Sequence, residues 1–181
     1  NSVLLDSNPL FGKIWPNENH TNGGEEGVHD SAHAIFDALA STSITSLSLR
    51  HTAMGLKASK QLAATLHLTK VTNLAISTNP IGDEAMIQVL DGIKEVSLVS
   101  LDVSNTGCEV STASKLAEIL RDATKFMAAV TSINCLANQF GEDDLATLLT
   151  AIEGTSVRSL CGLTEGQTTA DFSGQNLRPI D

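Results

Sequence analysis

The stretch VTNLAISTNPIGDEAMIQVLDGI, residues 71–93, decides the fold because two periodicities follow each other within it. Val71, Leu74 and Ile76 occupy near-alternating apolar positions, as in a strand with one buried face. Asn79 and Gly82 then mark a turn. After the turn, apolar residues recur at the spacing of one helix face: Met86, Val89, Leu90 and Ile93. The stretch therefore predicts a strand, a turn and a helix in that order.

The same pattern recurs along the chain. Strand patterns start at Ile44, Val71, Leu98, Val130 and Val157, so successive copies lie 27, 27, 32 and 27 residues apart. A unit of this length cannot bury its apolar face alone and must stack on its neighbours. The sequence therefore predicts an α/β solenoid, a single domain over 1–181 with about five to six repeats. Three further helix faces support it: Ser59, Leu62, Ala63 and Leu66; Ala113, Leu116, Ala117 and Leu120; Leu145, Leu148, Leu149 and Ile152.

This pattern closely resembles the leucine-rich repeat (LRR) family, specifically its ribonuclease-inhibitor-like class with L-x-x-L-x-L-x-x-N-x-I-x-x-x-G, which residues 71–93 match best. The resemblance implies a right-handed αβ horseshoe with a parallel sheet on the concave face and helices on the convex face. In that family the Asn side chain satisfies backbone groups of the turn. Asn79 and Asn138 keep this residue, whereas Thr52 and Thr106 replace it, so the resemblance leaves the geometry of those two turns open.

Both ends depart from the period. The first unit places its strand at residues 3–5 and its helix face at 32–39, and a polar, turn-rich insertion at about 11–27 makes it longer than the others. The insertion contains Trp15, the only Trp of the chain, which we expect to cap the first unit, or else to contact a partner from a loop.

The C-terminal unit, 157–181, is irregular. Residues 159–163 predict a fifth strand without a helix, and 170–177 predict a further strand, in stretches similar to those of LRR proteins from unicellular eukaryotes. Such a strand would present an unpaired sheet edge. We therefore expect weak self-association through this unit, with Phe172 near its centre.

The composition of the chain limits the classes of partner to be expected. The 181 residues carry a formal net charge of −10 and are 41% hydrophobic, which suits one soluble domain and disfavours nucleic acid or an anionic membrane surface as the ligand. No apolar run approaches the roughly 18 to 20 residues that a membrane span needs. Cys108 and Cys135 are expected to face the core and Cys161 to face outward, as reduced thiols of a cytoplasmic protein. The chain begins with Asn, so the sequence leaves secretion open.

Residues with catalytic chemistry are sparse, and we expect no enzyme, no cofactor and no metal. His29, His33 and Asp37 share one face of a predicted helix, which is more typical of a solvated surface than of a metal site.

A binding surface is the better hypothesis. The residues between the buried strand positions should point to solvent on the concave face: Ser46, Ser48, Arg50, Asn73, Ala75, Ser77, Ser100, Asp102, Ser104, Ser132, Asn134 and Leu136. Arg50 and Asp102 are its charged anchors. We expect a protein-interaction module with an unidentified protein partner. The alternatives are a GTPase regulator like the Ran GTPase-activating protein, which is similar in repeat class, with Arg50 nearest to a nucleotide, and a self-assembling structural protein.

Overall fold

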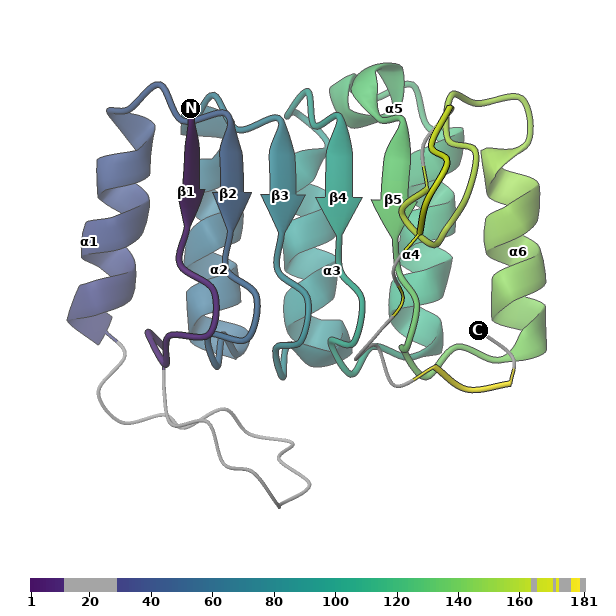
Figure 1. Ribbon diagram of the computed structural model, residues 1–181, viewed down its shortest axis with the longest axis horizontal. Coiled ribbons are helices and arrows are strands. Elements are labelled where there is room, and N and C mark those ends of the chain that lie inside the picture. The colour runs from purple at the N-terminus through teal and green to yellow at the C-terminus, as the bar shows by residue number, and fades with distance from the viewer. Residues whose placement is uncertain (12–28, 164–165, 171, 173–176, 180–181) are drawn as a thin grey trace.

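The predicted strands pair side by side in chain order (Figure 1). A computed structural model describes residues 1–11, 29–163, 166–170, 172 and 177–179, with only the backbone of 29–33. Within these residues one five-stranded parallel sheet is formed by β1 (Ser2–Leu4), β2 (Ser46–Ser48), β3 (Asn73–Ala75), β4 (Ser100–Asp102) and β5 (Ser132–Asn134). Equivalent residues of successive repeats face each other, as Leu47, Leu74 and Leu101 do. The predicted parallel sheet is thus confirmed.

The helices cover one side of this sheet. The described elements are α1 (His29–Ala40), α2 (Leu56–Thr65), the short 3₁₀ helix η1 (Leu66–Leu68), α3 (Gly82–Ile93), α4 (Val110–Arg121), α5 (Lys125–Ala129) and α6 (Glu142–Ile152). Figure 1 shows α2, α3 and α4 in a row behind the strands, with α1 and α6 at the two ends of the molecule. The chain is therefore an α/β protein whose arrangement is consistent with an LRR-like fold.

The core fills the space between the sheet and the helices. Leu74 from β3 and Val89 from α3 are buried, as are Leu101 and Leu116 in the next repeat, so the two periodicities of the sequence meet at one apolar layer. Phe11 also belongs to this core, where its ring stacks on Phe36 with the centroids 5.7 Å apart. Phe11, at the start of the predicted insertion, therefore supports the core of the first unit.

The turns after β2 and β3 are held together by one Asn that serves two repeats at once. Asn79 Oδ1 accepts hydrogen bonds from the backbone N–H groups of Thr52 (2.9 Å) and Met54 (3.0 Å) in the preceding repeat. Its Nδ2 donates to the carbonyls of Leu49 (2.7 Å) and Ile76 (2.9 Å). Because Asn79 supplies the groups that Thr52 lacks, the turn with Thr needs no Asn of its own.

The second Thr turn is built in the same way. Asn138 Oδ1 accepts from the N–H groups of Thr106 and Cys108, both at 3.1 Å, while Thr106 Oγ1 donates to the carbonyl of Val103. The residue before each Asn or Thr has a positive φ, between 51° and 59°, in all five turns: Ser7, His51, Thr78, Asn105 and Ala137. The two Thr turns therefore share the geometry of the Asn turns, which settles the question that the sequence left open.

The acidic residues at the helix starts act in two ways. Asp144 Oδ2 accepts from the N–H of Gly141 (2.9 Å) and so caps its own helix, α6. Asp83, at the start of α3, instead caps the following helix. Its carboxylate accepts from the N–H groups of Glu109 (2.8 Å) and Ser111 (3.2 Å) at the start of α4. Asp83 thus ties two repeats together.

The predicted strand over 159–163 is wrong, and most of the predicted strand over 170–177 lies outside the described residues. Residues 159–163 do not extend the parallel sheet, because the chain reverses and Cys161 forms an isolated antiparallel bridge with Asn134. Ala170 and Phe172 are likewise not in a strand. Because this segment turns back across the sheet beside β5, the free parallel edge expected for self-association is not found in the part of the chain that the structure describes.

Candidate functional site

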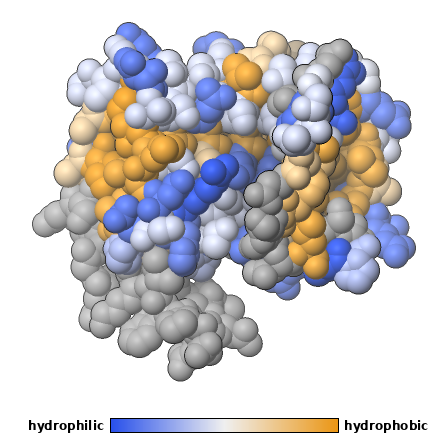
Figure 2. Space-filling model, in the orientation of Figure 1, coloured by the Kyte–Doolittle hydropathy of each residue, from blue (hydrophilic) through white to orange (hydrophobic). Residues whose placement is uncertain are grey.

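The sheet has one face that the helices leave uncovered, here called the open face. It carries the side chains that the sequence assigned to a binding surface, and it places them close together on β2 to β5 and the residues just after them. Figure 2 shows a hydrophilic band crossing this face, with apolar surface on both sides of it. The open face is therefore the candidate site.

Four serines of this face are more buried than the sequence suggested. Ser48, Ser77, Ser104 and Ser132 are only 4 to 6% exposed, whereas they were expected to point to solvent. Their side chains are short and are held beneath longer neighbours by hydrogen bonds, such as that from Ser132 Oγ to the carbonyl of Gly162 (3.0 Å). Leu136 is also buried, at 9%. The remaining predicted side chains, except Arg50, are half-buried: Ser46, Asn73, Ala75, Ser100, Asp102 and Asn134.

Asp102 is the centre of the polar band. Its Oδ2 accepts from Arg50 Nη2 (2.8 Å), Arg50 Nε (3.1 Å) and Ser77 Oγ (3.1 Å). Its Oδ1 accepts from Ser104 Oγ at 2.7 Å. The Asp102 side chain is 14% exposed and that of Arg50 is 50% exposed. The two predicted anchors therefore form one ion pair that spans β2 to β4, in which Asp102 is covered and Arg50 faces solvent.

Asp6 extends this network toward the N-terminus, and the sequence analysis missed it. Its Oδ1 accepts from Ser48 Oγ (2.5 Å) and from the N–H of Arg50 (2.9 Å). Because Leu4 pairs with Ser48, Asp6 holds the register position of Arg50 and Ser77. Extending the repeat alignment from Arg50 back to the first unit was the signal that could have found it.

The C-terminal segment forms one wall of the site. The N–H of Cys135 donates to the carbonyl of Leu160 (2.9 Å), and the N–H of Gly162 donates to that of Ile133 (2.8 Å). Between this wall and the strands lies a half-open groove of about 430 Å³. It is lined by polar groups of the sheet, Arg50 and Asp102 among them, and by Leu163 and Phe172 from the segment. Phe172 is therefore placed at the candidate site and not at a sheet edge.

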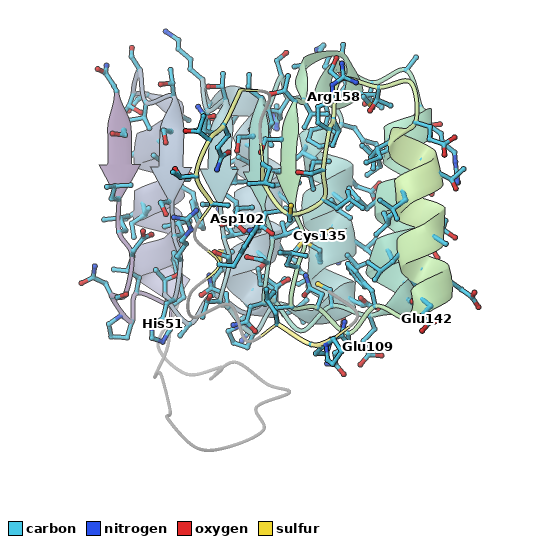
Figure 3. The ribbon with its side chains drawn as sticks, turned by 45° about the vertical axis from the view of Figure 1, so that its right-hand side comes forward. His51, Asp102, Glu109, Cys135, Glu142 and Arg158 are labelled. Atoms are coloured by element: carbon cyan, nitrogen blue, oxygen red, sulfur yellow. The ribbon has the colours of Figure 1, made fainter. Side chains whose placement is uncertain are left out.

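The rim of the open face carries further polar side chains. In Figure 3, His51, Glu109 and Glu142 lie along the edge where the strands end and the helices begin, away from Asp102 at the centre. Among the described residues no group of three or more His, Cys, Asp or Glu is placed to hold a metal ion. Trp15 and the side chains of His29 and His33 lie outside the described residues.

The three cysteines take the expected positions. Cys108 and Cys135 are buried in the core, while Cys161 is half-buried and lines the groove. Burial raises the pKa of the Cys108 thiol to about 11, although hydrogen bonds with Thr106 and Thr112 oppose this. The Cys108 side chain thus behaves as a small neutral core residue at neutral pH.

Comparisons with known proteins support the fold. No protein-family model matches the chain, and no curated protein matches it. Among solved structures, "Leiomodin-1 Actin-Binding Site 2 (ABS2)" matches with a TM-score of 0.52 and 14% sequence identity over 74% of this chain and 76% of that chain. At this identity the likeness concerns the fold alone. No helix of the described chain is long and apolar enough to cross a membrane.

Proposed function

We propose that this chain is an LRR protein of the ribonuclease-inhibitor-like class, and that it is a non-enzymatic module that binds a protein partner through its open face. In this proposal the open face is the concave side of a right-handed horseshoe. The comparison with leiomodin adds one point, because that solved structure is named for actin binding, so its fold carries a protein-binding site in another protein. The partner of this chain is a separate question.

The ion pair of Arg50 and Asp102 carries the proposal. Asp102 receives donors from Arg50, Ser77 and Ser104, so it fixes the guanidinium plane beside the groove before any partner arrives. Two of the five guanidinium N–H groups point to Asp102, and the half-exposed remainder can donate to a partner. A side chain held in place in advance loses little conformational entropy on binding, which favours affinity.

A site-specific crosslinking experiment tests this function. A photoreactive amino acid replaces Ser100 in the groove, and in a control protein it replaces Ser114, which is exposed on α4 behind the sheet. We expect a discrete protein adduct from position 100, absent from position 114, and lost when Arg50→Ala is added. Equal adducts from both positions, or an adduct that Arg50→Ala leaves unchanged, would refute binding by the open face.

The GTPase-regulator alternative gains no specific support from the geometry. Arg50 Nε and Nη2 are both engaged with Asp102, so only the remaining N–H groups of the guanidinium could reach a nucleotide on a partner. GTP hydrolysis by small GTPases, measured with the wild-type protein and with Arg50→Ala, tests it directly. A stimulation that depends on Arg50 would favour this alternative over a purely binding role.

A further inference from the structure

The last helix, α6, exposes an apolar face that the other helices bury. The repeat register makes Leu149 of α6 equivalent to Leu90 of α3 and Ala117 of α4. Leu90 and Ala117 are 0% and 1% exposed, whereas Leu149 is 55% exposed. Leu145 and Ile152, on the same stripe of α6, are half-buried, although their equivalents in α3 are fully buried. Figure 1 shows why: α6 stands at the end of the row of helices.

The charges beside this face are also unmatched. Within the row, neighbouring helices are joined by ion pairs: Lys60 Nζ to Glu84 Oε1 (3.0 Å), Lys115 Nζ to Asp91 Oδ1 (3.0 Å) and Lys94 Nζ to Glu118 Oε1 (3.4 Å). The helix α6 contains no Lys or Arg. The exposed acids Glu142 and Asp143 of α6, and Glu153 directly after it, have no ion pair among the described residues.

Two of these acids are at repeat positions whose equivalents in or directly after α3 contact the next helix, α4. Glu142 is equivalent to Asp83, whose carboxylate receives the first N–H groups of α4. Glu153 is equivalent to Lys94, which pairs with Glu118 on α4. A helix lying on α6 as α4 lies on α3 would therefore find an acceptor for its N-terminal N–H groups. It would also meet a negative charge where α4 meets a positive one, so its own side chain there should be basic.

We propose that the outer face of α6, formed by Leu145, Leu149 and Ile152 and bordered by Glu142 and Glu153, binds an amphipathic helix of a partner protein that carries Lys or Arg beside its apolar stripe. This is binding of a helix to an apolar face, and it is independent of the open face. A second copy of the chain fits less well. The formal net charge is −10, and α1, at the other end of the row, contains Asp37 but no Lys or Arg, so like charges would meet.

Two peptides that differ by one charge test the proposal. Each is a stapled, fluorescent copy of residues 110–121, the sequence of α4, and one carries Glu118→Lys. Fluorescence anisotropy with the whole protein should show saturable binding of the lysine peptide, at least about tenfold tighter than that of the Glu118 peptide. Leu149→Asp should weaken this binding by at least about tenfold. Leu68→Asp is the matched control, because Leu68 on η1 is 56% exposed and lies outside α6.

Three results with the peptides would overturn the proposal: equal binding of both peptides, binding that Leu149→Asp leaves intact, or no saturation at the highest peptide concentration. Circular dichroism of Leu149→Asp checks that the variant is folded, and Leu149→Ser replaces it if it is not. Light scattering tests the remaining occupant of this face, a second copy of the chain. A wild-type dimer that Leu149→Asp converts to a monomer would assign this face to a second copy and would refute the basic partner helix.

Discussion

The two faces of the sheet hold the same repeat by different means. Toward the helices each strand sends a large aliphatic side chain, such as Leu74 or Leu101, into a dry core. Toward the open face the neighbouring positions carry small or polar groups, such as Ser77 and Asp102, which are linked by hydrogen bonds. The first face draws its free energy from packing, and the second fixes the directions of polar groups at little net cost. Stability should therefore reside on one face and recognition on the other.

The largest loss of stability is expected from a substitution on the side of the sheet that the helices cover. Leu116 of α4 is fully buried at the position of Leu62, Val89 and Leu148, which are buried as well. Leu116→Ala should lower the free energy of unfolding by about 2 to 5 kcal/mol, because it leaves a cavity in the layer shared by neighbouring repeats. Urea denaturation measures this, with the exposed Ser114→Ala as a control on the same helix. An unchanged midpoint for Leu116→Ala would show that the repeat register is wrong.

The second effect concerns the turns that join the two faces. Asn79→Ala removes the partner of backbone groups in two repeats at once. A single buried group left unpaired costs about 1 to 3 kcal/mol, and the loss here should exceed that of one group, so we expect about 2 to 4 kcal/mol. Asn8 is exposed and bonds only the carbonyls of Leu5 and Asp6 in its own turn, so Asn8→Ala should cost less than about 1 kcal/mol. Equal losses in thermal denaturation would contradict the two-repeat role of Asn79.

The two faces of the sheet also differ in how well the sequence predicts them. The core positions were predictable because buried apolar residues repeat at fixed spacing, as at Leu74 and Val89. Burial of the serines was not, because it depends on hydrogen bonds across strands. The return of residues 159–163 over β5 was also missed: a short apolar segment such as SLCGL fits either a parallel strand or an antiparallel bridge, and only contacts distant in sequence decide between them.

A smaller, pH-dependent effect is expected at Asp83, where two repeats are tied. Burial alone would raise the pKa of Asp83, but hydrogen bonds from Thr112, Glu109 and Ser111 outweigh it and lower the pKa below the usual 3.8. A lowered native pKa means that the stabilisation is complete above the pKa of the unfolded chain and is lost as the pH falls through the native one. At pH 6, Asp83→Ala should cost about 1 kcal/mol, as for loss of a helix cap.

The pH series supplies the check on Asp83. The difference in free energy of unfolding between wild type and Asp83→Ala should be constant from neutral pH down to about pH 5 and should shrink below pH 4. Glu84→Ala is the neighbouring control, because Glu84 is exposed and pairs with Lys60 at the surface, a contact worth at most about 1 kcal/mol. A difference for Asp83→Ala that persists unchanged at pH 2 would mean that the charge of Asp83 does not hold α4.

The smallest effect on stability is expected where the largest effect on binding is proposed. Arg50→Ala removes a half-exposed ion pair and should cost less than about 1 kcal/mol, because solvent screens such a pair. Asp102 keeps its donors Ser77 Oγ (3.1 Å) and Ser104 Oγ (2.7 Å), so its carboxylate is not left bare. Thermal denaturation of Arg50→Ala beside crosslinking from position 100 separates the two roles. If Arg50→Ala lowers the free energy of unfolding by several kcal/mol and leaves crosslinking intact, Arg50 is a structural residue. The proposal that one face stabilises the fold and the other binds the partner would then be wrong.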